Sequence, residues 1–163
     1  MNANDTTKGF ERRRVVLSTL WIFAVLNYLY ADVFSLFFNP VLQKEVTRRL
    51  AEGYVGDIQI TQGFVLLTAI LMETAIAMVL LSRVLPYRAN RWANILSAAF
   101  HTLFVGWSLI GDAPNLFYGM FAAIEMACTL FIVWYAWKWP APSSQKARPD
   151  AVKLDRAELE GAG

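Results

Sequence analysis

The amino-acid sequence predicts an all-α fold: an antiparallel four-helix transmembrane bundle with a short amphipathic surface helix in its first outer loop. Hydrophobic residues make up 56% of the 163 positions and charged residues 17%, against about 25% charged in a typical soluble domain. The apolar residues gather in four runs, at 15–38, 58–82, 92–110 and 115–137. Each run is near the ~20 residues that a helix needs to cross ~30 Å of hydrocarbon.

The basic residues indicate how these helices are oriented in the membrane. Most of the 15 Lys and Arg residues lie before the first run, between the second and third, or after the fourth: Lys8, Arg12, Arg13, Arg14, Arg83, Arg88, Arg91, Lys138, Lys146, Arg148, Lys153 and Arg156. Only Lys44, Arg48 and Arg49 lie on the other side. Because cytoplasmic loops carry an excess of Lys and Arg, we expect a multi-pass protein of the bacterial inner (cytoplasmic) membrane with both termini in the cytoplasm.

The same pattern divides the chain into a cytoplasmic leader at 1–14, a four-helix transmembrane domain at 15–140 and a disordered cytoplasmic tail at 141–163. The tail is rich in Pro, Ser, Lys, Glu and Ala, a composition that buries too little apolar surface to fold. Pro86 separates the second run from the third. The sequence Gly-Asp-Ala-Pro-Asn at 111–115 predicts a tight turn between the last two helices.

The first outer loop carries the signals of a short helix at 41–52. Asn39 and Pro40 offer an N-cap followed by proline at the first helical position, and Gly53 offers a C-cap. Apolar residues recur every four positions between these signals, with charged residues on the other faces. This pattern is typical of an amphipathic helix that lies on the membrane surface.

Each apolar run contains one acidic or imidazole side chain. In chain order these are Asp32, Glu73, His101 and Glu125. A charge at the centre of a bilayer costs roughly 3 kcal/mol on insertion scales, so it is kept only where it has partners or a function. At helical spacing, each lies on a stripe with other polar or small residues. Lipid offers no hydrogen-bond partners, so these stripes should face inward.

We therefore expect Glu73, His101 and Glu125 to converge within the bundle, with Tyr28 and Asn94 nearby. Asp32 lies closer to the outer end of its helix, as an interfacial acid or as the outer step of a proton path. Two interpretations of the cluster stay open. The polar groups either bond to one another and hold the helices together, or they line a pocket in which a ligand or proton is handled.

Three stretches carry a resemblance to a known family. They are Asn-Tyr-Leu-Tyr-Ala-Asp at 27–32, Asn-Arg-Trp-Ala-Asn-Ile at 90–95, and the segment 117–140, which ends in Trp-Tyr-Ala-Trp-Lys-Trp-Pro. Together they resemble an uncharacterised family of small bacterial four-helix integral membrane proteins with a DoxX-like layout. The resemblance covers 15–140 and implies a fold and a membrane location. It implies no activity, because none is assigned to the family.

Several functional classes are excluded or disfavoured. Cys128 is the single cysteine, whereas a thiol oxidoreductase needs a pair. No phosphate-binding glycine loop or Ser-His-Asp set is recognisable, and we expect no nucleic-acid partner and no cofactor. A metal site formed by Glu73, His101 and Glu125 is disfavoured because the chain has one histidine and no helical Glu-x-x-His pair.

Three functions remain. The favoured one is binding or transport of a small lipophilic or cationic ligand, with proton exchange at the buried Glu/His/Glu cluster. The second is a membrane-embedded acid-base enzyme acting on a lipophilic substrate, and the third is a structural accessory subunit of a membrane complex. The expected partners are membrane lipids, the ligand itself, and a second copy of the chain or a larger membrane complex.

Overall fold

The computed structural model describes residues 3–55, 58–109 and 116–140, and nearly all of them are helical. The elements, in chain order, are α1 (Ala3–Val33), the π-helical turn η1 (Phe34–Phe38), α2 (Pro40–Glu52), β1 (Tyr54–Val55), β2 (Ile58–Gln59), α3 (Gln62–Val84), α4 (Tyr87–Ser108) and α5 (Leu116–Trp137). The two short strands pair antiparallel. The sequence analysis did not predict this hairpin.

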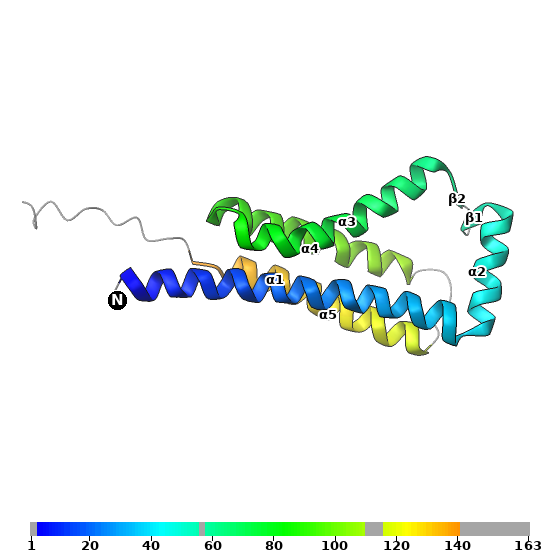
Figure 1. Ribbon diagram of the computed structural model, residues 1–163, viewed down its shortest axis with the longest axis horizontal. Helices are drawn as coiled ribbons and strands as arrows, with labels where there is room; N and C mark the ends of the chain where they lie inside the picture. The colour runs from blue at the N-terminus through cyan, green and yellow to red at the C-terminus, as the bar shows by residue number, and fades with distance from the viewer. Residues whose placement is uncertain (1–2, 56–57, 110–115, 141–163) are drawn as a thin grey trace, which may run out of the picture.

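Four long helices pack side by side. α1 packs against α3 and α5, and α4 packs against the same two helices, so that the four close into a ring. Successive long helices run in opposite directions, and α2 lies across one end (Figure 1). We call this end the α2 end. We call the other end, where α1 begins and the α3–α4 connection lies, the basic end.

Within the described part of the chain, three helices are long and apolar enough to cross a membrane: α1 together with η1, α3 and α5. The sequence predicted four such helices. α4 has 22 residues, about 33 Å at 1.5 Å per residue. It is therefore long enough, but its polar residues make it less apolar than the others. Its buried side chains include Asn90, Asn94 and His101.

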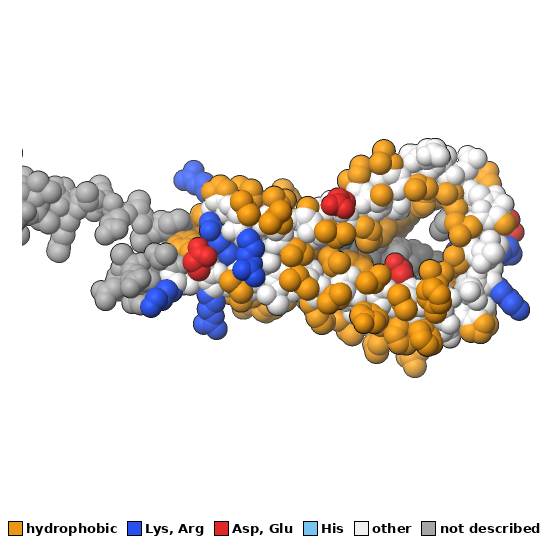
Figure 2. Space-filling model, in the orientation of Figure 1, with side chains coloured by type: hydrophobic (Ala, Val, Ile, Leu, Met, Phe, Trp, Pro, Cys, Tyr) orange, Lys and Arg blue, Asp and Glu red, His pale blue; other side chains and the backbone are white. Residues whose placement is uncertain are grey.

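Several polar side chains are buried, while many large apolar side chains are exposed. The buried polar residues are Ser18, Asn27, Ser82, Asn90, Asn94, His101, Glu125 and Thr129. Exposed apolar side chains cover much of the visible surface, while Lys and Arg gather at the two ends (Figure 2). Such a distribution is expected where the surroundings of the helices are themselves apolar.

The predicted helix in the first loop is confirmed. The Asn39 side chain accepts a hydrogen bond from the Leu42 backbone N–H at 3.0 Å, and Pro40 is the first helical residue. Gly53 ends the helix with φ of 76°, a conformation that glycine adopts without a Cβ clash. Local capping chemistry is thus sufficient to define this element.

The start of α1 corrects the predicted leader. Residues 3–14 continue the first helix instead of forming a separate segment. Phe10 packs edge-on against Tyr87 with ring centroids 5.7 Å apart, and Arg14 donates to the Leu85 carbonyl at 3.1 Å. Contacts with the α3–α4 connection therefore support this part of the helix. The predicted tail at 141–163 and the turn at 111–115 lie outside the described residues.

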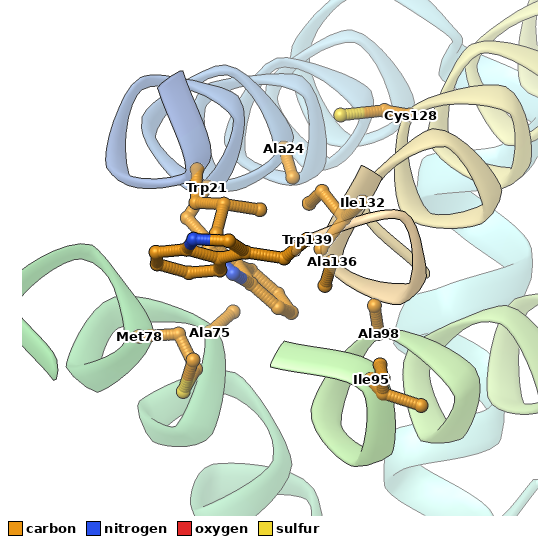
Figure 3. Packing of buried hydrophobic residues seen from close by; sticks show 11 residues of the cluster. Trp21, Ala24, Ala75, Met78, Ile95, Ala98, Cys128, Ile132, Ala136 and Trp139 are labelled. Carbon is orange, nitrogen blue, oxygen red and sulfur yellow. The ribbon is translucent and has the colours of Figure 1, made fainter. Parts of the chain in front are cut away.

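The tightest apolar packing lies toward the basic end. Trp21 of α1 lies among small side chains of the other helices, with Ala75, Ala98 and Ala136 in the same cluster (Figure 3). Small residues let helices approach closely where no hydrophobic effect drives them together. Trp139 is also in this core and only 2% exposed. Trp134 and Trp137, in contrast, are exposed.

Candidate functional site

A network of buried polar side chains joins α1, α3 and α4 toward the basic end. Asn94 is its centre: Trp21 Nε1 donates to Asn94 Oδ1 at 2.8 Å, and Ser82 Oγ donates to the same oxygen at 3.1 Å. Asn94 Nδ2 donates to Asn90 Oδ1 at 2.7 Å. Asn90 in turn donates to the Ser82 carbonyl at 2.6 Å. All four side chains are fully buried and have partners, so this network holds the helices together.

Arginines bind backbone carbonyl groups at the same end. Arg13 donates to the Tyr135 carbonyl at 3.1 Å, and Arg91 donates to the Trp137 carbonyl at 3.0 Å. Both carbonyls lie in the last turn of α5, where backbone acceptors lack intrahelical partners. A cation there also complements the helix dipole. The α5 C-terminus is thus satisfied by charged side chains from α1 and α4.

His101 lies further along α4 and is only half satisfied. Its Nδ1 is hydrogen bonded to the Tyr28 hydroxyl at 3.1 Å, and the Trp21 ring packs edge-on against the imidazole with centroids 5.6 Å apart. The Leu71 backbone of α3 interacts with the ring as a hydrogen-bond partner, although the contact of Nε2 lacks good hydrogen-bond geometry. The side chain is 0% exposed. A buried polar atom of this kind calls for a physical explanation.

Glu125 of α5 is also buried and has one bond to a side chain. Asn27 Nδ2 donates to Glu125 Oε1 at 3.2 Å and to the Phe121 carbonyl at 3.1 Å. The carboxyl group accepts no other hydrogen bond from the described residues, and the residue remains 6% exposed. Asp32 of α1 is close enough to act on Glu125 electrostatically, and its own side chain is exposed.

Glu73 does not join the other two, so the prediction that all three converge is wrong for this residue. Its side chain is exposed and forms no hydrogen bond or ion pair with another described residue. The buried stripe of α3 is Leu71, Ala75, Met78 and Ser82. Glu73 is two residues from both Leu71 and Ala75, about 200° around a helix. It therefore lies on the opposite face from the packed stripe.

A hollow lies at the α2 end of the molecule. Figure 2 shows it bounded by α2, the hairpin, the first part of α3 and the adjoining end of α1. No side chain from Gln62 through Ile70 is buried, which places the first half of α3 away from the packed bundle. Leu71 is the first buried residue of α3. Since its backbone approaches His101, the imidazole lies where α3 separates from the other helices.

The long helices supply no basic side chain to this region, whereas α2, which bounds the hollow, carries Lys44, Arg48 and Arg49. Lys and Arg are absent from 15–43, 50–82 and 92–137. The acids of the site, Asp32 and Glu125, therefore have no cationic partner within the long helices. No group of three or more His, Cys, Asp or Glu residues in the described part of the chain is arranged to hold a metal ion.

Sequence patterns located some of these residues and missed others. Tyr28, Asn94, His101 and Glu125 face the interior as predicted, although they belong to three separate hydrogen-bonded groups. The main omissions were Asn27, which binds Glu125, and Ser82 and Asn90, which complete the Asn94 network. Asn27 lies one position from the stripe through Tyr28. The position of the Asn27 amide next to a stripe predicted to face inward was the signal in the sequence that could have identified it.

The exposed face of α5 carries a stripe of small residues. Gly119, Ala123 and Ala127 have the spacing of a small-residue packing face. Ala123 and Ala127 are exposed, and the buried small residues of α5 are instead Ala122 and Ala136. The regular spacing alone did not show which face of the helix is packed.

Fold and site together define a helical protein with three helices that could cross a membrane and a partly satisfied polar interior. The chain belongs to a family described as a family of unknown function, DUF6326, which matches residues 7–145. This agrees with the predicted membership of an uncharacterised family. No curated protein and no solved structure matches the chain. The bacterial origin and the DoxX-like layout stay predictions.

Proposed function

We propose that this protein is a four-helix integral membrane protein whose hollow binds a small lipophilic or cationic molecule, with Glu125 exchanging protons as the molecule binds. α4 is then the fourth crossing. Its exposed face carries Trp92, Leu96, Phe100, Leu103 and Trp107, and its polar residues face the bundle. A helix of this kind meets lipid on one side and a polar interior on the other, which accounts for its lower apolar content.

The distribution of charge supports an orientation with the basic end in the cytoplasm. The basic residues in the first part of α1, at the end of α3, at the start of α4 and just after α5 lie together at one end, whereas those of α2 lie at the other. Under the positive-inside rule the described ends of α1 and α5 then face the cytoplasm of an inner membrane. Reporter fusions at Gly53, at Arg88 and after residue 163 test this orientation. If α4 did not cross, the reporter after residue 163 would be external.

The observation that carries the binding proposal is the buried carboxyl group of Glu125, which accepts one side-chain hydrogen bond, from Asn27, and has spare acceptor capacity. Leaving a buried polar group short of partners costs about 1–3 kcal/mol. A ligand that enters the hollow and donates hydrogen bonds would satisfy this carboxyl group. The Asn94 network, in contrast, has no atom left for a ligand.

Two other functions receive less support. An acid-base enzyme would use His101 and a glutamate on one substrate, but His101 bonds to Tyr28 while Glu125 bonds to Asn27. A purely structural accessory subunit accounts for the Asn94 network. It gives no reason for an imidazole with one unsatisfied nitrogen.

Native mass spectrometry of the protein purified in lipid nanodiscs tests the proposal. We expect a small molecule to co-purify with the wild type and to be lost from the Glu125→Gln variant, which keeps volume and hydrogen-bonding capacity but removes the titratable group. Glu73→Gln is the matched control and should retain the molecule, because Glu73 faces away from the packed stripe. Equal retention by both variants would contradict a role for Glu125.

A further inference from the structure

We propose that a second copy of this chain docks on the outward face of α3, so that two α3 helices pack in parallel with Glu73 at the centre of the contact. The inference rests on the membrane insertion proposed above and does not depend on the hollow or its ligand. We define the α3 seam by six exposed residues on one face of the helix: Gln62, Leu66, Ala69, Glu73, Ile76 and Leu80.

The spacing of the α3 seam is that of a helix–helix contact. Its residues follow steps of four, three, four, three and four positions, the 3.5-residue repeat with which two helices pack side by side. Helices in membranes mostly cross at the same shallow angle as soluble coiled coils. At about 100° per residue, the seam is centred nearly opposite the stripe that packs within the chain: Leu71, Ala75, Met78 and Ser82. One face of α3 thus contacts its own bundle, and the other is available to another chain.

Glu73 is the member of the seam that lipid alone does not accommodate. It lies at the midpoint of α3, with eleven residues of the helix on each side. Its side chain is exposed and has no partner among the described residues, whereas Glu125 and His101 are buried within the bundle. A charged side chain at the bilayer centre costs roughly 3 kcal/mol on insertion scales, and such residues almost always face protein or water. A protein surface that covers Glu73 therefore accounts for its position.

The first half of α3 also lacks packing within its own chain. No side chain from Gln62 through Ile70 is buried, and this half of the helix diverges from the rest of the bundle (Figure 1). The outer face of α4 is equally exposed, but its large side chains are aliphatic and aromatic, so lipid is a sufficient neighbour for it. The α3 seam differs because two of its six positions, Gln62 and Glu73, are polar.

The chemistry of these two positions favours a second copy as the partner. All copies insert with the same orientation, so two α3 helices related by a twofold axis along the membrane normal run parallel, and each residue faces its own counterpart. A carboxyl group in its neutral form has a donor and an acceptor, and so has an amide. Glu73 and Gln62 are thus each satisfied by the same residue of the other copy. Ala69, one step along the seam from Glu73, lets the two backbones approach closely.

Disulfide cross-linking of the full chain in native membranes tests the contact. Leu66→Cys and Leu67→Cys form a matched pair, because both leucines are 61% exposed and adjacent, but only Leu66 lies on the seam. Both variants also carry Cys128→Ala, so that the introduced thiol is the single one. With copper phenanthroline and air as the oxidant, we expect about tenfold more dimer from Leu66→Cys, because a disulfide requires Cα atoms within ~7 Å of each other.

Equal dimer formation by the two cysteine variants would indicate random collision and would overturn the proposed contact. A disulfide between Leu66→Cys and a different protein, or no disulfide in either variant, would overturn the second copy as the partner. None of these results bears on the ligand of the hollow, which Glu125→Gln tests separately.

Energy transfer between labelled copies in liposomes tests the contribution of Glu73 itself. Glu73→Leu should raise the dissociation constant of the dimer about threefold to thirtyfold, the effect of one interhelical hydrogen bond in a membrane. Glu73→Gln keeps a donor and an acceptor and should associate like the wild type. Because the α3 seam makes no contacts within one chain, neither variant should change the fold of a single copy, which circular dichroism checks. Equal dissociation constants for the wild type and Glu73→Leu would contradict the central role of Glu73.

Discussion

Two groups of buried polar side chains in the helix bundle differ in how fully they are hydrogen bonded. Toward the basic end, Asn94 and its three neighbours have their side-chain hydrogen bonds formed, and arginines bind the carbonyl groups at the end of α5, although Arg14 Nε, Arg91 Nε and Trp139 Nε1 at this end have no partner among the described residues. Toward the α2 end, His101 and Glu125 each make one side-chain bond and retain further capacity. The first arrangement stabilises a fold, and the second is available to a ligand. Polarity in an apolar helix is therefore informative about function only where it is left incomplete.

The largest effect expected from this comparison is on the Asn94 network. Replacing Asn94 with Leu removes the acceptor for Trp21 and Ser82 and the donor to Asn90, so three buried groups lose a partner at once. We expect a loss of about 3 kcal/mol in the free energy of unfolding, given about 1–3 kcal/mol per unsatisfied group in water-soluble proteins and less within membranes. Denaturation in mixed micelles measures it.

A control on the same helix separates this effect from a general sensitivity of α4. Leu103 is 72% exposed on the outer face, and Leu103→Ala should change stability little, because no packed group is removed. A stability loss in Leu103→Ala as large as that in Asn94→Leu would show that the network has no special role.

A second effect, of about 1 kcal/mol, is expected at Glu125. Glu125→Leu leaves Asn27 with the Phe121 carbonyl as its remaining partner, so one hydrogen bond is lost. Glu125→Gln keeps an acceptor for Asn27 and should unfold like the wild type. Glu73→Leu removes an exposed carboxyl group without partners and should not destabilise. Thermal unfolding in nanodiscs compares the three variants, and equal losses for Glu73→Leu and Glu125→Leu would mean that the two acids have similar surroundings.

How far the sequence predicts this arrangement depends on how much local information each helix carries. α2 was predicted to within a residue because Asn39, Pro40 and Gly53 cap it through local hydrogen bonds and backbone conformation. In α4, polar residues on one face and apolar residues on the other predicted which face is turned inward. Asn94 and His101 both lie on that face. These are cases in which the physics of a single helix is sufficient.

α3 shows why the rest could not be predicted. Nearly all of its residues are apolar, so the pattern does not distinguish a packed face from an exposed one. Because Glu73 was assumed to mark the inward face, the predicted orientation of α3 about its own axis differs from the observed one by about half a turn. The position of the true packed stripe depends on side chains of α1 and α4, such as the bond from Ser18 to the Val79 carbonyl at 2.8 Å. Tertiary contacts of this kind leave no periodic signal in the sequence.

A smaller effect still is expected at His101. His101→Phe keeps an aromatic ring against Trp21 but removes both nitrogens, so the bond to Tyr28 is lost together with the unsatisfied Nε2. The two changes oppose each other, and we expect the free energy of unfolding to change by less than about 1 kcal/mol. A strongly destabilised His101→Phe protein would place this residue with the structural network instead.

The smallest effect on stability is expected at α2, where the ion pairs lie on the exposed surface. The Arg48 and Arg49 side chains donate hydrogen bonds to Glu45 and lower the pKa of its carboxyl group from 4.5 to about 2. Because the pKa is lower in the folded state, the stabilisation is complete above pH 4.5 and is lost as the pH falls toward 2. Carbon-13 NMR of the Glu45 carboxyl group in nanodiscs measures the titration.

Replacing Arg48 and Arg49 with Gln should return the pKa toward 4.5, while the bundle stays folded because α2 has no buried residue. A wild-type midpoint near 4.5 would mean that these pairs do not persist. Ion pairs on α2 then differ from the carboxyl groups of the hollow in one decisive respect: they have their own cations, so they leave no charge for a ligand to balance.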